Sequence, residues 1–469
     1  MKNIAKIAAA VLVTTLAALP SFAAPGSADF TRLVAIGDSY GAGYENGGIV
    51  AEHQNFSWPA VLARQVGYRI CQPTDTATSN CFAQPTVSSP GIPSLLQLQD
   101  LSGTIIKLPG QGSPVMLNFA RPYNNLSVPG ANVTDVLTIK GNESQTSAAA
   151  FILRGLGTQV EQALAQHPTF VAIWIGGNDL LSAVAGGTPN NLTPVAQFKT
   201  SYETMLNAIA TNAPNAGIVV GNLPNSPFAV PLVNTVPPFI VNPATRQPVL
   251  GPDGKPIYLV ADLGGGLGFG QLPAGSFVLL SAAAKLRTGY GIPGALAQVP
   301  PFNALPDVGK PLSDADVLTP TEVAAIVARA NEYNTVITTA ASAKGIPVAD
   351  IKSLFDSVVV SPTTGAGGLQ VGPIRLTNAF VSGGFFGLDG VHLTDLGYIL
   401  FANQYIKAIN QGYGTEIPLA SITQIFANNG AMFPSASSLP GDPFRITSEA
   451  AQQIPKVFQR PRKGRASSH

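Results

Sequence analysis

Short runs of apolar residues alternate with longer amphipathic stretches along most of the chain. Unbroken apolar runs bounded by glycine cover residues 33–36, 170–175 and 217–221, as is typical of buried parallel strands. A shorter run at 346–350 predicts a fourth strand. Apolar residues at helical spacing predict helices at residues 58–66, 149–166, 194–210, 320–343 and 396–410. Strands that alternate with helices indicate a parallel sheet covered by helices, an α/β fold.

Two long segments interrupt this alternation. Residues 72–125 are rich in Pro, Ser and Gly, and residues 222–318 contain a hairpin signal at Pro252–Lys255 and a glycine-rich apolar run at 263–280. Loops of this length inside a compact domain are usually lids or walls of binding sites. The pattern therefore predicts one domain over residues 24–412 that carries both segments as insertions.

The first 23 residues predict a secretory signal peptide that is removed from the mature chain. Lys2 and Lys6 precede a charge-free apolar run over residues 7–19, and small residues follow at Ser21 and Ala23. The alternative is a retained membrane anchor, but the run is short for a membrane span, which needs ~20 apolar residues. We therefore expect a secreted or periplasmic protein with no integral membrane segment.

The chain ends in an extension over residues 413–469 that follows the last predicted helix. This extension is rich in Pro and Ser and closes with a basic cluster at Lys456–Arg465. Such a segment is typical of a solvated terminus, so we expect the tail to be flexible.

Composition narrows the classes of partner and cofactor. With 26 Lys and Arg against 25 Asp and Glu, the formal net charge is +1, which argues against nucleic acid as a partner. Cys71 and Cys81 lie close together in an exported chain and predict a disulfide, with two free thiols as the alternative. Two cysteines and four scattered histidines give no zinc-binding spacing, so we expect neither a metal site nor a cofactor. Of the histidines, His53 fits a surface loop and His167 a helix end.

The letters AIGDSYGAG, residues 35–43, place Ser39 directly after the first predicted strand. That position is the carboxyl end of a parallel sheet, where open α/β folds bind their ligands. The flanking Gly37 and Gly41 permit a sharp turn and the close approach of a substrate. The alternative is an ordinary strand-to-helix turn in which Asp38 or Ser39 caps a helix.

Three further segments carry the groups that a serine nucleophile needs, namely a base, an acid and donors to an oxyanion. In LDGVHLTDLGY, Asp389 and His392 lie three residues apart, so one short loop can hold a carboxylate against an imidazole. Asn178 follows the second predicted strand, where its amide either donates to an oxyanion or forms an Asx turn or a helix cap. Gly130 lies in a turn and can present a bare backbone N–H.

These four segments, in this order, resemble the SGNH (GDSL) hydrolase family of esterases and lipases over about residues 30–412. The resemblance implies a flavodoxin-like three-layer α/β/α sandwich with a five-stranded parallel sheet. It also implies that Ser39 is the nucleophile, that His392 is the base, and that Asp389 orients the imidazole.

The same resemblance assigns the donors to the oxyanion. They would be the backbone N–H groups of Ser39 and Gly130 together with the side-chain amide of Asn178. One position departs from the family pattern, because Tyr40 stands where leucine is more usual. We expect this departure to affect only packing.

The letters around Ser39 also spell a G-x-S-x-G motif, which an α/β-hydrolase could use. In that fold several strands precede the serine, but only about 16 residues separate Ser39 from the predicted mature terminus. The acid would also lie far upstream of the histidine rather than three residues before it. We therefore reject this interpretation.

The resemblance implies acyl transfer from an ester through a Ser39 acyl-enzyme. The apolar side chains of the 222–318 insertion either wall a groove for an acyl chain or fill a small core of their own. These side chains are Phe228, Val230, Val233, Pro238, Phe239, Ile240, Leu263, Leu267, Phe269, Phe277, Leu279 and Leu280.

The substrate class follows from weaker signals. Recognition of acetylated sugars would favour exposed aromatic side chains, but Trp58 and Trp174 are the only tryptophans. We therefore favour lipid or short-chain carboxyl esters as substrate. We also expect the protein to be a monomer. The alternatives are a carbohydrate acetyl esterase of the same fold and a non-catalytic secreted binding protein on a hydrolase scaffold.

Overall fold

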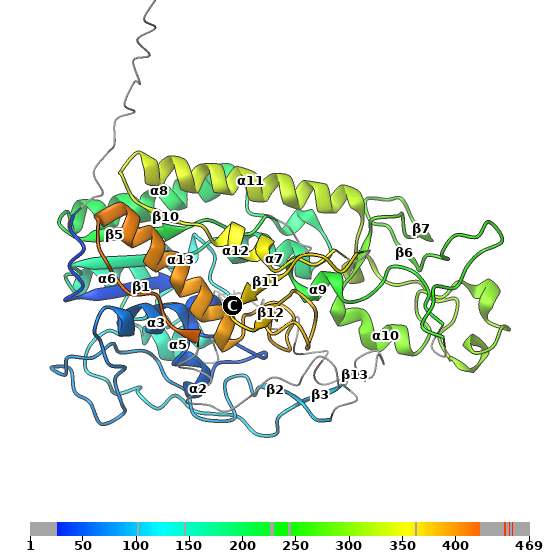
Figure 1. The fold of residues 1–469 in the computed structure, drawn as a ribbon, viewed down its shortest axis with the longest axis horizontal. Coiled ribbons are helices and arrows are strands. Elements are labelled where there is room, and N and C mark those ends of the chain that lie inside the picture. The colour runs from blue at the N-terminus through cyan, green and yellow to red at the C-terminus, as the bar shows by residue number, and fades with distance from the viewer. Residues whose placement is uncertain are drawn as a thin grey trace, which may run out of the picture.

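The computed structural model places the predicted strands side by side in one parallel sheet (Figure 1). The described residues are 26–100, 103–144, 147–225, 229–242, 245–361, 364–422, 445–446, 450 and 453. The predicted signal peptide and the basic cluster at 456–465 lie outside them. Within these ranges no helix is both long and apolar enough to span a membrane.

The sheet contains β1 (Leu33–Gly37), β4 (Phe170–Trp174), β5 (Gly217–Gly221) and β10 (Val348–Ala349), in the order β1-β4-β5-β10. All neighbours pair in parallel, with Leu33 opposite Phe170 and Phe170 opposite Gly217. Every residue of β1, β4 and β5 is buried, which explains why these strands are unbroken apolar runs in the sequence. All four strands confirm the sequence prediction.

A fifth parallel segment, residues 124–128, lies along the free edge of β1. The amide of Ala35 donates to the carbonyl oxygen of Asn124 at 2.8 Å, and the amide of Leu126 donates to the carbonyl oxygen of Ala35 at 2.9 Å. The five-stranded parallel arrangement implied by the family resemblance is therefore present, with β1 second from one edge.

Two groups of helices pack on different sides of the sheet (Figure 1). α3 (Trp58–Gln65) and α13 (Asp395–Tyr413) pack against each other, and α13 also contacts β5 and β10. The second group contains α6 (Gln159–Ala165), α8 (Val195–Asn212) and α11 (Pro320–Ser342), in which α6 contacts β1 and α8 packs against both others. The three layers confirm the predicted α/β/α sandwich.

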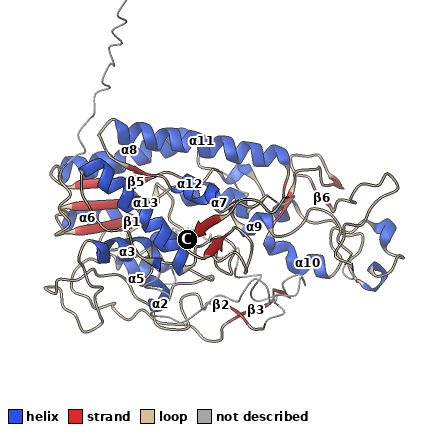
Figure 2. Cartoon of the chain, in the orientation of Figure 1, coloured by secondary structure: helices blue, strands red, loops and turns tan. Residues whose placement is uncertain are grey.

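The other elements are short, and many lie among the long loops that Figure 2 draws in tan. The helices are α1 (Ser39–Ala42), α2 (Ala51–Gln54), α4 (Asp135–Thr138), α5 (Ala148–Leu153), α7 (Gly177–Ala185), α9 (Pro231–Asn234), α10 (Ala283–Arg287) and α12 (Ile351–Ser357). The strands are β2 (Leu96–Leu98), β3 (Thr104–Lys107), β6 (Val260–Asp262), β7 (Phe269–Gln271), β8 (Phe277–Val278), β9 (Val317–Leu318), β11 (Leu369–Val371), β12 (Ile374–Leu376) and β13 (Arg445–Ile446).

One predicted helix is two helices in the structure. The sequence pattern predicts a single helix over residues 149–166, but α5 and α6 are separated by a tight turn. Arg154 and Gly155 have left-handed backbone conformations, with φ of 57° and 70°, which a right-handed helix cannot pass through. Thr158 then begins α6 with a capping box. Apolar periodicity takes no account of such a turn, so the prediction merged the two helices.

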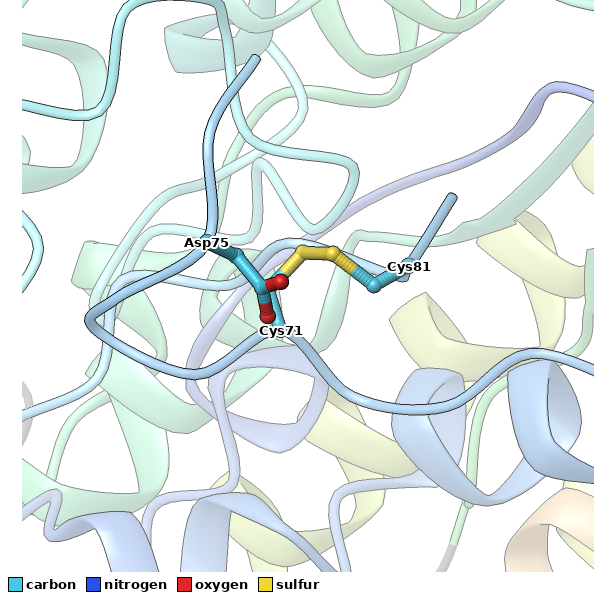
Figure 3. Close-up of side chains that lie close together, drawn as sticks. All are labelled: Cys71, Asp75 and Cys81. Carbon is cyan, nitrogen blue, oxygen red and sulfur yellow. A yellow bond between two sulfur atoms is a disulfide. The ribbon is translucent and has the colours of Figure 1, made fainter. Parts of the chain in front are cut away.

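The predicted disulfide between Cys71 and Cys81 is present at the start of the first insertion (Figure 3). The two sulfur atoms belong to a small buried apolar cluster that also contains Phe119. Asp75 lies beside the disulfide, where its carboxylate accepts two 2.6 Å hydrogen bonds from the guanidinium of Arg69. The disulfide leaves neither sulfur as a thiolate, so this cluster does not form a metal site.

The second insertion, residues 222–318, has a small hydrophobic core of its own. The buried members of this core are Ile240, Leu259, Ala261, Leu272, Val278, Ala282, Ile292, Phe302, Leu312 and Val317. The predicted turn at Pro252–Lys255 is also present, because the amide of Gly251 donates to the carbonyl oxygen of Lys255 at 2.8 Å.

The apolar side chains that the sequence analysis names in this insertion lie in different environments. Ile240 belongs to the small core, and Val230, Val233, Leu279 and Leu280 belong to the main core of the domain. Leu267 and Phe269 are exposed at 76% and 72%. Phe228 lies outside the described residues. Core filling therefore accounts for most of the buried members of this set.

Part of the C-terminal extension packs on the domain. β13 pairs in parallel with β3. The side-chain amide of Gln453 donates to the carbonyl oxygens of Gly47 and Ser94 at 2.8 and 2.6 Å. These contacts involve only residues 445–446 and 453 of the extension beyond residue 422, and the flexibility of the tail stays a prediction.

Candidate active site

Ser39 lies at the carboxyl end of β1, where it is the first residue of α1. Asp38 caps this helix, because its Oδ1 accepts a 3.0 Å hydrogen bond from the amide of Tyr40. A Cβ at Gly41 would lie 2.1 Å from Ser127 Oγ, so the turn has no room for a side chain there. Since Asp38 supplies the cap, the hydroxyl of Ser39 is available for another partner.

The structure brings Ser39, His392 and Asp389 together in one chain of hydrogen bonds. Ser39 Oγ lies 2.8 Å from His392 Nε2, and His392 Nδ1 lies 3.1 Å from Asp389 Oδ2. Each of the three residues is at most 2% exposed. Such a chain allows an imidazole to take a hydroxyl proton while a carboxylate stabilises the imidazolium that forms.

Backbone amides hold the Asp389 carboxylate in place. Its Oδ1 accepts hydrogen bonds from the amides of Val391 and His392 at 2.9 and 2.8 Å, and its Oδ2 accepts one from Gly47 at 2.8 Å. Burial by itself raises the pKa of Asp389, but the imidazole and amide of His392 and the amide of Val391 outweigh it and hold the pKa below its ordinary value. Asp389 is therefore an anion at neutral pH.

Asn178 lies on α7, beside the turn that contains Gly130. Asn178 is the second residue of α7, and its Nδ2 donates a 2.9 Å hydrogen bond to the carbonyl oxygen of Ala131. Gly130 has φ of 79°, a left-handed conformation that favours glycine. The N-cap of α7 is Gly176, so Asn178 does not cap this helix. An amide nitrogen carries two N–H groups, and donation to Ala131 therefore leaves one for a substrate oxygen.

An apolar pocket lies close to these residues. Tyr40 and Gly177, the sequence neighbours of Ser39 and Asn178, form part of its wall. Its other walls come from β4, α7, α11, α12, the segment after β5 and the start of α9. They include Trp174, Leu181, Val184, Leu223, Val230, Ile326, Ala330 and Phe355. The pocket thus lies next to the Ser39 turn, between α7, α11 and α12.

The sequence matches the family model of the GDSL-like lipases and acylhydrolases over residues 33–405. The chain belongs to this family. It is therefore an ester-hydrolysing serine hydrolase, and the matched region spans the whole sheet and both insertions.

Two solved structures are similar to this GDSL hydrolase. An extracellular lipase from Streptomyces rimosus is 17% identical, with 81% of this chain and 99% of that chain covered and a TM-score of 0.30. A phospholipase A1 from Streptomyces albidoflavus is 14% identical, with 83% of this chain and 100% of that chain covered and a TM-score of 0.30. No protein of curated function shows a significant match to the sequence.

Tyr40 of the GDSL hydrolase does more than fill space, so the expectation that it affects only packing is wrong. Its hydroxyl donates a 2.7 Å hydrogen bond to the carbonyl oxygen of Val391. Its ring centroid lies 4.8 Å from that of Trp174 and 5.2 Å from that of His392. Leucine could not make this hydrogen bond. The only sequence signal for it is the departure from the family pattern at this position.

His53 also differs from its prediction. It lies on α2 rather than on a surface loop, and its side chain is only 15% exposed. Its imidazole forms ion pairs with the carboxylates of Glu45 and Asp395. His53 and Asp395 are 342 positions apart, so no local pattern in the sequence could reveal the pair.

Proposed function

We propose that this protein is a secreted carboxyl-ester hydrolase that forms an acyl-enzyme on Ser39. The observation that carries the proposal is the hydrogen-bonded chain from Ser39 Oγ to His392 Nε2 at 2.8 Å and from His392 Nδ1 to Asp389 Oδ2 at 3.1 Å. The signal-like sequence of the first 23 residues and the disulfide support secretion. Residues 24–412 form the catalytic domain in this proposal.

The reaction proceeds by two acyl transfers. His392 Nε2 takes the proton of the Ser39 hydroxyl while Oγ forms a bond to the ester carbonyl carbon. The N–H groups of Ser39 and Gly130 and the amide of Asn178 stabilise the negative charge that develops on the carbonyl oxygen. The imidazolium then protonates the leaving alcohol as its C–O bond breaks, and an acyl-enzyme remains. A water molecule that gives its proton to His392 attacks the acyl-enzyme, and the carboxylic acid and free Ser39 are released.

The apolar pocket supports an ester with a hydrocarbon acyl chain, such as a lipid or a short-chain carboxyl ester. Its wall includes Tyr40 and Gly177, so a chain bound there would start beside Ser39. Each CH₂ group buried in such a pocket is worth about 0.8 kcal/mol. Specificity should therefore rise with acyl chain length until the pocket is full.

Hydrolysis of p-nitrophenyl esters of graded chain length tests this function. The wild-type chain should hydrolyse them and should reach a maximum of kcat/KM at one chain length, whereas Ser39→Ala should be inactive. A serine-reactive fluorophosphonate should label the wild type and not Ser39→Ala. Labelling or turnover that persists in Ser39→Ala would show that another residue is the nucleophile.

A matched pair of substitutions on α11 tests the pocket. Ala330 is 1% exposed and lines the pocket, whereas Ala328 lies on the same helix and is exposed. Ala330→Leu should move the maximum of kcat/KM to shorter chains, and Ala328→Leu should leave it in place. An unchanged chain-length profile in Ala330→Leu would place the acyl chain elsewhere.

A further inference from the structure

Loop 44–48, residues Tyr44–Gly48, holds the turn that carries Asp389. The amide of Gly47 donates to Asp389 Oδ2 at 2.8 Å. On the same turn, the amide of Leu388 donates to Asn46 Oδ1 at 2.7 Å. The bond to Asp389 is buried and the bond from Leu388 is part-buried, so the loop contributes to the position of the carboxylate together with the amides of its own turn.

Glu45 connects this loop to two other elements through a buried ionic cluster. His53 Nδ1, on α2, lies 3.3 Å from Glu45 Oε2 and 3.1 Å from Asp395 Oδ1, on α13. The side chains of Glu45, His53 and Asp395 are 7%, 15% and 13% exposed. Asp395 lies in the first turn of α13, three positions after His392. The cluster therefore links loop 44–48 to the chain segment that follows the imidazole.

His53 supplies the positive charge of this cluster. Burial by itself lowers the pKa of His53, but Glu45 and Asp395, with a smaller contribution from Glu52, raise it to about 9. Burial raises the pKa of Glu45, with Asp395 and Asp389 adding to the effect and His53 opposing it. His53 is therefore an imidazolium at neutral pH that attracts acidic side chains from two other segments.

One more cation faces the cluster. Arg64 of α3 lies close enough to Asp395 for the carboxylate to oppose the lowering of the arginine pKa that burial causes. Arginine remains charged at every pH at which the protein is folded. Of these two cations, His53 is therefore the one whose charge changes in the working range of pH.

We propose that Glu45, His53 and Asp395 are positioning residues for catalysis. They form a brace that holds loop 44–48 against the start of α13 and so keeps Asp389 and His392 aligned with Ser39. The brace acts through the backbone, by way of the hydrogen bond from Gly47 to Asp389, and its members do not touch the substrate. This inference rests on the proposed roles of Ser39, His392 and Asp389.

His53→Gln tests the brace, because it removes the positive charge and keeps a polar side chain. We expect kcat for a soluble p-nitrophenyl ester to fall about 10- to 100-fold, the cost of a small misplacement of reacting groups, with KM nearly unchanged. In the wild type kcat should also fall as the pH rises through about 9, where His53 loses its proton. This alkaline limb should be absent from His53→Gln. A residue that only stabilises the fold would change the melting temperature and leave the pH profile of kcat in place.

Two further variants define the effect. His167 is an exposed histidine with φ of 48°, so His167→Asn is a matched control that should change neither kcat nor the pH profile. Asp395→Asn should lower kcat about as much as His53→Gln, and the double variant should cost no more than the larger single one, because both break the same brace.

Three results would overturn the brace. The first is a normal kcat in His53→Gln, and the second is an alkaline limb that persists in that variant. The third is a stoichiometric transition-metal ion that metal analysis finds in the wild type and not in His53→Gln, because His53 would then be a ligand. The Ser39→Ala assay separates failure of the brace from failure of the proposed function. If Ser39→Ala is inactive and His53→Gln has a normal kcat, only the brace is overturned.

Discussion

The hydroxyl of Tyr40 donates a 2.7 Å hydrogen bond to the carbonyl oxygen of Val391. This bond joins the residue that follows Ser39 to the residue that precedes His392, across 351 positions of sequence. Burial raises the pKa of Tyr40 well above its ordinary value, so the hydroxyl keeps its proton and remains a donor. The nucleophile turn and the turn of the base are therefore tied together directly.

Tyr40→Phe should lower both stability and turnover. It leaves the carbonyl oxygen of Val391 buried without this donor, which costs about 1–3 kcal/mol of the free energy of unfolding. Because that carbonyl lies beside His392, kcat should fall while KM stays nearly constant. Denaturant unfolding and steady-state kinetics measure the two effects. Tyr413→Phe is the control. It removes a hydroxyl that donates to the carbonyl oxygen of Ile218 at 2.9 Å and accepts from the amide of Ile218 at 2.7 Å, neither of which is linked to the site, so it should change stability alone.

Asp389→Asn should lower kcat on the order of 10⁴-fold, as loss of the orienting carboxylate does in other serine hydrolases. The amide cannot stabilise the imidazolium that forms on His392, and it presents a donor where the native group only accepts. Asp350→Asn removes a carboxylate that caps α12 through the amide of Ser353 and should leave kcat near the wild-type value. A loss below about threefold in Asp389→Asn would mean that another group orients the imidazole.

Asn178→Ala should lower kcat by roughly 10²- to 10³-fold, because it removes one donor to the oxyanion. KM should change little, since this hydrogen bond strengthens only as charge develops in the transition state. Asn212→Ala is a suitable control, because Asn212 Nδ2 also donates to a backbone carbonyl, that of Ala208 at 2.8 Å, on an exposed surface. A near-normal kcat with a lowered melting temperature would mean that Asn178 stabilises the fold through its bond to Ala131 and does not take part in catalysis.

The free energy of unfolding should fall as the pH rises towards about 9. The pKa of His53 is raised from 6.5 to about 9 in the folded protein, so the folded state holds this proton more tightly than the unfolded chain. The stabilisation is fully present below pH 6.5 and is lost as the pH rises through about 9. Denaturant unfolding at several pH values should show a larger loss in the wild type than in His53→Gln. Equal losses would mean that the pKa of His53 is not raised in the folded protein.

Replacing both Cys71 and Cys81 with serine should lower the free energy of unfolding by about 2.7 kcal/mol in the chain-entropy model for a loop of this length. kcat should stay near the wild-type value, because the disulfide lies at the start of the first insertion and contributes nothing to the hydrogen bonds of Ser39. Alkylation under denaturing conditions followed by intact-mass analysis gives an independent check. The wild type should accept two alkyl groups after reduction and none before it.

The sequence by itself determined the elements that depend on local pattern. The strands at 33–37, 170–174 and 217–221 are unbroken apolar runs because both of their faces are buried. The start of α11 at Pro320 follows from the capping box of Thr319. The position of Ser39 at the carboxyl end of β1 is also predictable from the sequence, because Gly37-Asp38-Ser39 directly follows the apolar run of that strand.

Only the tertiary structure decided the relations between distant segments. It alone shows that residues 124–128 complete the sheet and that His53 lies between Glu45 and Asp395. It also separates the apolar side chains of the second insertion into buried ones and exposed ones such as Leu267. The residue type determines which interactions a side chain can make, but burial and pairing depend on which other segment packs beside it. Which segment packs there depends on the whole chain and cannot be predicted from neighbouring residues alone.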